Sequence, residues 1–401
     1  MAKLKTATDE AMLAEQVRQA FKTGTPLEII GGGTKLAFGR PVEAEDQISV
    51  SGLSGITLYE PAALTIVAKA GTPLKEINDA LAAEGQQLPF EPANYAGLLG
   101  SKGEPTIGGT IACGISGPRR IQAGAARDSL IGVRFVTGEG EIVKNGGRVM
   151  KNVTGYDLVK LMCGSHGTLG ILTELSFKVL PNPETTAVLL LTGLSDEAAI
   201  GALSAALTSP YDVTGAAHTP HGLDGEPVTM IRIQGFRKSV KYRSEKLREV
   251  LAQFGPADIE TSARTKAGWK WVRDVEGFAK EKGAVWRISC KPTDGPKIVA
   301  DLQTLEISNV LYDWGGGLIW LAVPETDDCG AEQIRRTVSN HGGYATLVRA
   351  SAETRKKIPV FHPQSPVLDK ISRDLRQKFD PAGILNPGRM APAEALELEE
   401  S

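Results

Sequence analysis

Glycine is concentrated in one part of this chain, between Glu104 and Val179. The segment runs EPTIGGTIACGISGPRR, then RDSLIGVRFVTGEGEIV, and later KNVTGYDLVKLMCGSHGTLGILTELSFKV. A chain places glycine where its backbone turns with positive φ or approaches another group closely. A further triplet, Gly31–Gly33, follows a short apolar run at Leu27–Ile30. Together these glycines predict backbone that wraps around a large, phosphate-bearing cofactor.

The bulk composition is that of an ordinary soluble globular protein. The 401 residues suffice for two domains, and 41% of them are hydrophobic and 23% charged. The 45 basic and 47 acidic residues nearly cancel, and the local basic patch Pro118–Arg120 is small. A nucleic-acid partner is therefore not expected.

Cysteine spacing and the N-terminus bear on metal content and location. The four cysteines lie far apart in sequence. Zinc and iron–sulfur sites usually need closely spaced ligands, so we expect neither, and we expect reduced thiols. The N-terminal segment lacks the apolar core of a signal peptide, and no run reaches about 18 apolar residues. We expect a cytoplasmic protein that meets the inner face of the cell membrane only through a partner.

The first half of the chain alternates helix and strand signals. Thr8 and Thr72 are expected to cap two helices, and Gly24 and Gly85 to end them. The stretch Glu91–Gln122 carries no periodic signal and is expected to be an irregular, functional segment. Strands are predicted at 27–30, 64–70, 87–90, 130–136, 141–143 and 171–179, and a short helix capped by Asp157 at 158–162.

Two prolines in Pro181-Asn182-Pro183 mark the expected domain boundary. Beyond it, strands and helices alternate in a way that predicts a sheet with helices packed on one face. The expected ranges are a first domain at 5–181, a second at 182–390 and a flexible acidic tail at 391–401. Strands are predicted at 186–191, 228–234, 284–290, 310–314 and 318–323, and helices at 196–208, 239–254, 266–278 and 329–340.

The glycine loops allow two interpretations. GGGTK at Gly31–Lys35 is neither a Walker loop nor a Rossmann fingerprint, because neither spacing is present. It could be a tight turn after a strand, or a nest whose backbone N–H groups hold a pyrophosphate. Two further glycine clusters, at 106–124 and 164–170, favour an extended ligand. A dinucleotide-sized flavin fits that requirement.

The motifs GGGTK, TIGG, KNVTGYDL and GSHGTLGILTEL resemble the vanillyl-alcohol-oxidase (PCMH-type) FAD-binding family. FDPAGILNPGR, at Phe379–Arg389, resembles the C-terminal signature of its 2-hydroxyacid dehydrogenase branch. Within that branch, ACGISGPRR, GGRVMKNVTGYDL and DWGGGLIWL are most similar to the FAD-binding subunits E of bacterial glycolate oxidases. The resemblance covers about residues 5–390. It implies an α+β fold, with a two-subdomain FAD-binding domain followed by a FAD-linked oxidase C-terminal cap domain.

The resemblance also implies the residues that hold the cofactor. The pyrophosphate loop would be Gly31, Gly32, Gly33, Thr34 and Lys35, and Gly32→Val would abolish binding by opposing a positive φ and filling the anion's space. Ile171 would offer backbone to one end of FAD, Tyr156 and Asp157 would fix the flavin-side wall, and Asn386 would return beside the cofactor. Residues along the cofactor would be Pro92, Thr106, Gly108, Gly109, Gly114 and Gly117.

FAD is expected to be noncovalent. Covalent members of the family carry His or Cys near these loops, and Gly24–Arg40 contains neither. Cys113 and His166 are the remaining candidates for a covalent link.

This sequence lacks two motifs of catalytic relatives, HxGDGNxH and a later EHG, which ligate a metal and take the substrate proton. His218 and His221 are expected to lie in an exposed loop rather than to bind a metal. Among the basic residues of the second domain, Arg232, Arg273 or Arg287 could meet an anionic substrate, although salt bridges are the default.

The sequence has the loops of a flavin-binding site but no recognisable proton-abstracting base. This combination favours a chain that is one subunit of a complex, which oxidises glycolate, a short 2-hydroxy acid, to glyoxylate. The implied partners are a homologous catalytic FAD subunit and an iron–sulfur subunit. One alternative is a self-sufficient FAD-dependent 2-hydroxyacid dehydrogenase, with Tyr156 or a histidine of the second domain as base. The other is a structural subunit with a vestigial FAD cradle.

Overall fold

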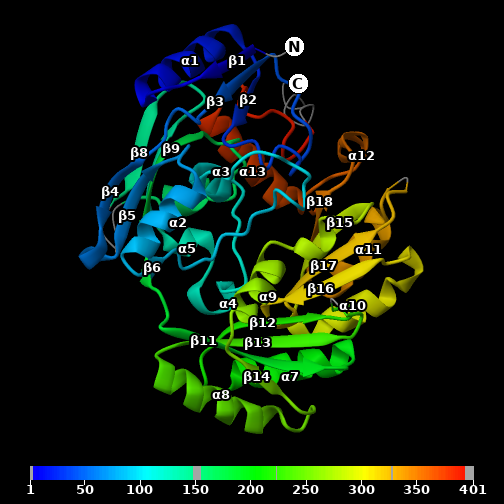
Figure 1. Cartoon of the computed structure of the whole chain (residues 1–401). Coiled ribbons are helices and arrows are strands. Elements are labelled where there is room, and N and C mark those ends of the chain that lie inside the picture. Colours follow the sequence, from blue (N-terminus) through cyan, green and yellow to red (C-terminus); the bar gives the residue numbers. More distant parts are fainter. Residues whose placement is uncertain (1–2, 148–154, 223, 327, 393–401) are drawn as a thin grey trace. The chain divides into compact units, whose positions relative to one another are not determined.

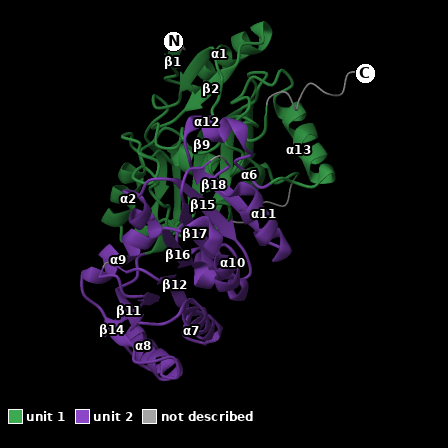
Figure 2. Ribbon diagram, turned by 90° about the vertical axis from the view of Figure 1, so that its right-hand side faces the viewer, with its two compact units in different colours: residues 1–116, 124–181, 363–401 green, residues 117–123, 182–362 purple. Residues whose placement is uncertain are grey.

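A computed structural model describes residues 3–147, 155–222, 224–326 and 328–392. The chain divides into two compact units, which Figure 2 shows in different colours. Unit 1 comprises Met1–Ser116, Gly124–Pro181 and Pro363–Ser401, and unit 2 comprises Gly117–Ala123 and Asn182–His362.

These units and the predicted domain ranges share the break between Pro181 and Asn182. They differ in two places. The segment from Pro363 onward groups with unit 1, because Leu385 pairs with Leu27 beside the first sheet. Gly117–Ala123 groups with unit 2, where Trp314 Nε1 donates to the Gly117 carbonyl at 3.1 Å. Most of the predicted acidic tail, residues 393–401, lies outside the described residues.

Unit 1 is built on a three-stranded parallel sheet and a five-stranded antiparallel sheet (Figure 1). The strand orders are β1-β3-β2 and β4-β5-β9-β7-β8, and β10 pairs with β6. The strands are β1 Lys3–Thr6, β2 Leu27–Ile30, β3 Asp46–Ser49, β4 Ile56–Glu60, β5 Thr65–Lys69, β6 Gln86–Gln87, β7 Leu130–Val136, β8 Ile142–Gly146, β9 Ile171–Lys178 and β10 Leu180–Pro181. The α-helices are α1 Glu10–Thr23, α2 Leu74–Ala83, α3 Ile107–Ala112, α5 Ala126–Ser129, α6 Leu158–Met162 and α13 Pro366–Phe379.

The first two helices begin one residue later than the sequence suggests. Asp9, not Thr8, caps α1, because its carboxylate accepts from the Met12 N–H at 2.7 Å. Thr72 does not cap α2, because its hydroxyl donates to the Lys69 carbonyl at 2.7 Å and so closes the turn after β5. The strand predicted at 87–90 is limited to β6.

The irregular stretch predicted at 91–122 contains two short helices, α3 and α4 (Arg120–Ala123). Two glycines in the six residues of α3 lower its intrinsic helix propensity. Tertiary contacts replace that propensity, since the Gly108 N–H donates to the Ala70 carbonyl at 2.8 Å. A Cβ at position 108 would lie 2.7 Å from that oxygen, so only glycine permits this approach.

Unit 2 is built on one eight-stranded antiparallel sheet of order β14-β11-β13-β12-β16-β17-β15-β18. The strands are β11 Thr185–Thr192, β12 Val213–Thr219, β13 Val228–Gly235, β14 Asp258–Glu260, β15 Ala284–Ser289, β16 Asn309–Asp313, β17 Leu318–Val323 and β18 Tyr344–Arg349. Besides α4, its α-helices are α7 Asp196–Thr208, α8 Arg237–Leu251, α9 Arg264–Arg273, α10 Gly295–Asp301, α11 Ala331–Asn340 and α12 Ala352–Lys357. The predicted α+β fold with an antiparallel second sheet is confirmed.

Helices lie on both faces of this sheet, not on one as predicted. Residues of α7, α8, α10 and α11 share the main core with alternate strand residues such as Leu189 and Ile231. The neighbouring strand residues Val188 and Met230 point the other way and pack against Trp269 of α9. Because successive side chains of a strand alternate between faces, α9 lies on the opposite face.

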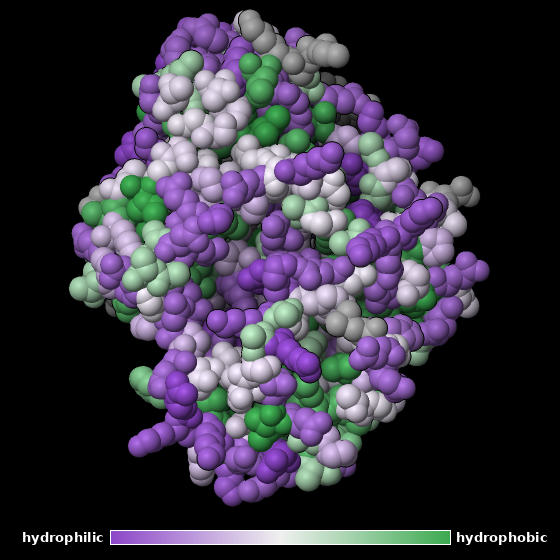
Figure 3. Space-filling model, viewed as in Figure 1, coloured by the Kyte–Doolittle hydropathy of each residue, from purple (hydrophilic) through white to green (hydrophobic). Residues whose placement is uncertain are grey.

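Figure 3 shows hydrophilic residues intermixed with smaller apolar patches on one face of the molecule. Over the described parts of the chain, no helix has both the length and the apolar content needed to cross a membrane.

His218 is a buried strand residue rather than part of the exposed loop that the sequence predicts. It lies in β12 with no solvent exposure, and its Nδ1 is 2.9 Å from the Thr229 hydroxyl. Its Nε2 is 3.3 Å from Asp196 Oδ1, and the Tyr312 hydroxyl donates to Asp196 Oδ2 at 2.6 Å. These bonds join the first turn of α7 to the sheet. His221 alone is exposed.

We expect Tyr312→Phe to destabilise the protein by about 1.5 kcal/mol, because a charged carboxylate loses a buried donor. Burial acts to raise the pKa of Asp196, but hydrogen bonds from His218 and Tyr312 outweigh it and lower the pKa. Stability from such a group is present above its unfolded pKa, about 4, and is lost as pH falls through the folded pKa. Urea unfolding should therefore show this difference in unfolding free energy between Tyr312→Phe and the parent above pH 4, and a smaller difference below pH 4.

Tyr344→Phe is the matched control, because Tyr344 is 61% exposed. Equal losses from the two substitutions would show that the Tyr312–Asp196 bond contributes nothing.

Candidate cofactor site

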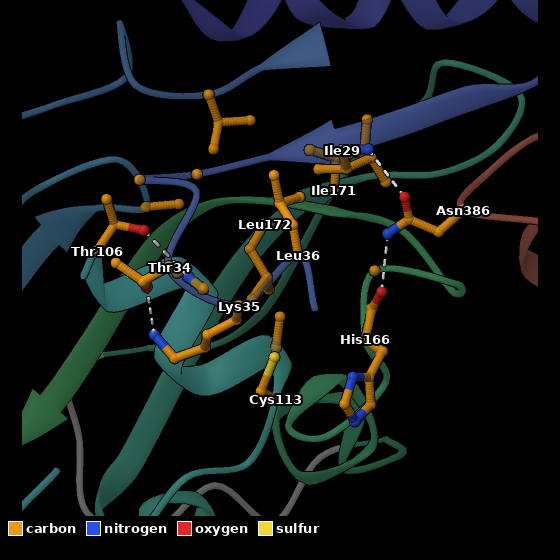
Figure 4. A pocket seen from close by; sticks show the side chains of 18 of the residues that line it. Ile29, Thr34, Lys35, Leu36, Thr106, Cys113, His166, Ile171, Leu172 and Asn386 are labelled. Carbon is orange, nitrogen blue, oxygen red and sulfur yellow. Dashed lines mark hydrogen bonds between the residues drawn. The ribbon is translucent and has the colours of Figure 1, made fainter. Parts of the chain in front are cut away.

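Unit 1 contains an open cavity (Figure 4). It lies where the parallel strands β2 and β3 end, a place where open sheets commonly bind ligands. The C-terminal segment after α13 completes the wall. The lining residues are Ile29, Gly31, Gly32, Gly33, Thr34, Lys35, Leu36, Phe38, Val50, Ala70, Thr106, Gly108, Gly109, Ala112, Cys113, His166, Gly167, Gly170, Ile171, Leu172, Asn386 and Arg389.

Most of the residues that the sequence nominates for the cofactor come together here. Those in the wall are Gly31, Gly32, Gly33, Thr34, Lys35, Thr106, Gly108, Gly109, Ile171 and Asn386.

Five other nominated residues lie outside this wall: Pro92, Gly114, Gly117, Tyr156 and Asp157. Gly117 groups with unit 2, and the Tyr156 side chain is 88% exposed. Asp157 caps α6 instead, since its carboxylate accepts from the Lys160 N–H at 3.2 Å. These five residues were nominated because they belong to sequence motifs. Whether a motif residue reaches the wall depends on how the loops fold together, which the motif does not show.

The backbone of Gly31–Lys35 has unused hydrogen-bond donors. None of its five N–H groups donates a hydrogen bond to another described residue. Gly33 has a φ of 74°, in the left-handed region that turns successive N–H groups toward one side. Since buried or half-buried backbone donors usually have partners, this loop is suited to bind an anion.

The loop is held by a second backbone segment that passes very close to it. A Cβ at Gly32 would lie 1.6 Å from the Glu104 carbonyl oxygen, and a Cβ at Gly103 would lie 1.8 Å from the Gly32 oxygen. A Cβ at Gly31 would lie 2.6 Å from Thr106 Oγ1. No side chain fits between these segments, so glycine is required for packing and not only for the turn.

The first amides of α3 are already occupied. Ile107 N–H donates to the Thr72 carbonyl at 3.0 Å, Gly108 N–H to Ala70, and Gly109 N–H to Thr106 Oγ1 at 3.3 Å. The glycines of the TIGG motif therefore let the backbone of α3 pack closely at the wall. The N–H groups that remain free to bind a ligand belong to Gly31–Lys35.

Asn386 connects three segments of the wall. Its Oδ1 accepts from Ile29 N–H at 2.8 Å, and its Nδ2 donates to the His166 carbonyl at 2.8 Å (Figure 4). Its own N–H donates to the Leu27 carbonyl at 2.9 Å. Asn386 is buried with a φ of 45°, a conformation that asparagine tolerates better than most residues.

The wall is positively charged. Lys35 and Arg389 line it, and no aspartate or glutamate does among the described residues. Burial lowers the pKa of Lys35, which is expected for an ammonium group that has no carboxylate beside it. Burial, with a smaller effect of Arg389, holds the pKa of His166 at about 3, so this imidazole is neutral near pH 7.

The wall also contains Arg389, Phe38 and Leu172, which the sequence motifs did not indicate as cofactor-binding residues. Arg389 is the last residue of the FDPAGILNPGR motif, so a sequence signal for it exists. The sequence suggests Cys113 only as a candidate for a covalent link. Burial raises the pKa of its thiol, although Lys35 and Arg389 act in the opposite direction.

All three arginines nominated in the second domain have structural partners. Arg232 is buried, donates to the Thr214 carbonyl at 3.0 Å and stacks over Trp269. Arg273 forms two hydrogen bonds to Asp274, both at 2.8 Å. Arg287 lies over Trp314, with 5.5 Å between its Cζ and the ring centroid. No cluster of three or more His, Cys, Asp or Glu side chains suited to a metal occurs within the described ranges.

Residues 2–146 match the FAD binding domain family, and together with the full-length relative below this match makes the chain a flavoprotein. It is 39% identical over 381 residues to glycolate oxidase subunit GlcE of Escherichia coli (strain K12), which covers 94% of this chain and 96% of the relative. The chain belongs to the GlcE family of glycolate oxidase subunits.

More distant comparisons agree with this assignment. Glycolate oxidase subunit GlcD of Bacillus subtilis (strain 168) is 31% identical over 262 residues, which is 65% of this chain and 51% of that protein. The solved structure of an alkyldihydroxyacetonephosphate synthase superposes with a TM-score of 0.71 at 17% identity, covering 96% of this chain and 75% of that one. The second likeness shows the fold alone.

We expect Gly32→Ala to lower both the stability of the FAD-free protein and FAD affinity, the latter at least about tenfold. The added Cβ must displace the Glu104 carbonyl, whereas the positive φ that the sequence places at Gly32 occurs at Gly33. FAD titration and thermal unfolding would measure both effects.

Gly85→Ala, outside the cavity wall, is the matched control. Gly85 has a φ of 63° and its Cβ would meet no atom within 4 Å, so only the left-handed strain of about 1–2 kcal/mol is added. FAD affinity should stay within about threefold of the parent. If both variants lose affinity equally, the packing explanation is wrong.

Proposed function

We propose that this chain holds FAD noncovalently in the unit 1 cavity as one subunit of a complex that oxidises glycolate to glyoxylate. The observation that best supports the cofactor site concerns the described residues: the five N–H groups of Gly31–Lys35 have no partner among them, and they line a wall with two cations and no carboxylate. The support for glycolate is the similarity to the Escherichia coli subunit.

The residues of the cavity suit the parts of FAD. The N–H groups of Gly31–Lys35 would bind the diphosphate oxygens, and the Lys35 ammonium would offset their charge. Apolar side chains such as Phe38 and Leu172 would pack against the rings. When bound, FAD would supply the capacity to accept two electrons and pass them on.

Of the two candidates for covalent attachment, Cys113 lacks activation. A nucleophilic thiol needs a lowered pKa, and burial raises the pKa of Cys113. The His166 ring packs edge to face on the Phe38 ring at 5.2 Å, and both side chains are buried. The raised pKa of the thiol supports noncovalent binding.

A partner subunit would supply the base and the metal for glycolate oxidation. The sequence lacks the histidine motifs of catalytic relatives, and His218 is committed to Asp196 and Thr229 in a core. The proposed partners are a homologous catalytic FAD subunit and an iron–sulfur subunit that takes electrons onward. The complex would work in the cytoplasm, at the inner face of the membrane through those partners.

The chain alone should retain FAD after desalting, and anaerobic glycolate should leave its absorbance band unbleached. The same chain in its purified complex should be part of an assembly that glycolate does bleach. Acid precipitation should release all the flavin, as noncovalent binding requires.

Two results would contradict the proposal. Bleaching of the isolated, FAD-loaded chain by glycolate would make it a self-sufficient dehydrogenase. Absence of FAD from this chain, both alone and in the complex, would show that the cavity does not bind the cofactor and that the chain is a structural subunit.

A further inference from the structure

The Arg389 guanidinium is buried at the cavity wall with part of its hydrogen-bonding capacity unused. Arg389 is 4% exposed. Its Nη2 donates to Glu28 Oε1 at 2.9 Å, and its Nη1 donates to the Leu36 carbonyl at 2.8 Å. A guanidinium carries five N–H donors, and these two bonds leave about three without an acceptor among the described residues.

No side-chain nitrogen of Arg389 is among the fully buried atoms that lack a partner, so its remaining donors are open to a ligand in the cavity that Arg389 lines. Among the described residues, the wall that Arg389 shares with Lys35 supplies no carboxylate. Glu28 is engaged on one side of the guanidinium and also accepts from Gln47 Nε2 at 2.8 Å. An anionic ligand in the cavity would supply the missing oxygens, and a phosphate suits the planar fork of arginine.

We propose that Arg389 binds the diphosphate of FAD directly and that Glu28 orients its guanidinium for that contact. This assignment rests on the proposed function. Arg389 thereby becomes a cofactor-binding residue, beside the backbone of Gly31–Lys35, and the chemical group recognised is the phosphate oxygen of a dinucleotide.

The competing role of Arg389 is purely structural: it would act as a latch that holds the C-terminal segment against the loop after Lys35. The Arg40 N–H donates to the Arg389 carbonyl at 3.0 Å, and a Cβ at Gly39 would lie 2.7 Å from Arg389 Cδ. Arg389 thus also ties the C-terminal segment to the loop that follows Lys35. The ion pair with Glu28 would serve this latch equally well.

The two roles predict opposite effects of a change at Glu28. If Arg389 meets phosphate, Glu28→Gln removes a negative charge from beside the guanidinium, while the amide oxygen can still accept its hydrogen bond. FAD should then bind more tightly. If Arg389 is only a latch, Glu28→Gln and Arg389→Gln break the same ion pair, and both should weaken binding.

The test is FAD titration of the full FAD-stripped chain by flavin fluorescence at fixed ionic strength, for the parent and three variants. We expect Arg389→Gln to weaken binding at least about tenfold, which is the size of a lost charged hydrogen bond. Arg389→Lys should lie between it and the parent. Glu28→Gln should bind FAD at least about twofold more tightly. Melting temperatures of the FAD-free proteins show whether any variant has lost its fold.

Three results would overturn the assignment. These are an Arg389→Gln affinity within threefold of the parent, a Glu28→Gln variant as weak as Arg389→Gln, and a parent chain that binds no FAD. The last also removes the proposed function, whereas the first two leave it standing. If Arg389→Gln does not fold, the direction of the Glu28→Gln effect decides.

Discussion

The cofactor cavity depends on the contact between two stretches of bare backbone. Gly32 and the Gly103–Glu104 segment approach so closely that a Cβ on either glycine would lie within 2 Å of the other segment's oxygen. This contact fixes the loop after β2 against the start of α3. Because the loop is fixed from outside, its own N–H groups need no partners within the protein, and five of them remain available. A rigid row of donors costs little further ordering when an anion binds.

The charged side chains of the wall also suit an anionic ligand. The described lining contains Lys35 and Arg389 but no acidic side chain, and the one carboxylate that pairs with Arg389 belongs to Glu28 of β2. The buried His166 contributes no charge, since its pKa is held at about 3. Backbone donors and two cations therefore lie together in the proposed anion site, and Asn386 joins β2 to the 164–170 loop beside it.

Local sequence features predicted what is local in the structure. The triplet Gly31–Gly33 after an apolar strand predicted a glycine loop, which lines the cavity, and the Pro181-Asn182-Pro183 signal coincides with the break between the two units. Strands of clear alternation, such as β9, were also found where expected.

Features that depend on distant partners were not predictable in this way. Helix α3 has poor intrinsic propensity and forms because Ala70 and Thr72 accept its first amides. Strand β12 carries small residues without alternation, so its buried His218 was mistaken for a loop residue. Arg389 reaches Glu28 across 361 positions of sequence. The motif indicated that this arginine was present but not where its guanidinium would lie.

The most direct test of the account is hydrogen–deuterium exchange of the chain with and without FAD, resolved over Gly31–Lys35 and over α3. The free amides of Gly31–Lys35 should exchange rapidly without FAD and become strongly protected when FAD binds. The amides of Gly108 and Gly109, already bonded within the protein, should change little. Protection that appears in α3 while Gly31–Lys35 stays unprotected in the FAD-loaded chain would contradict the account.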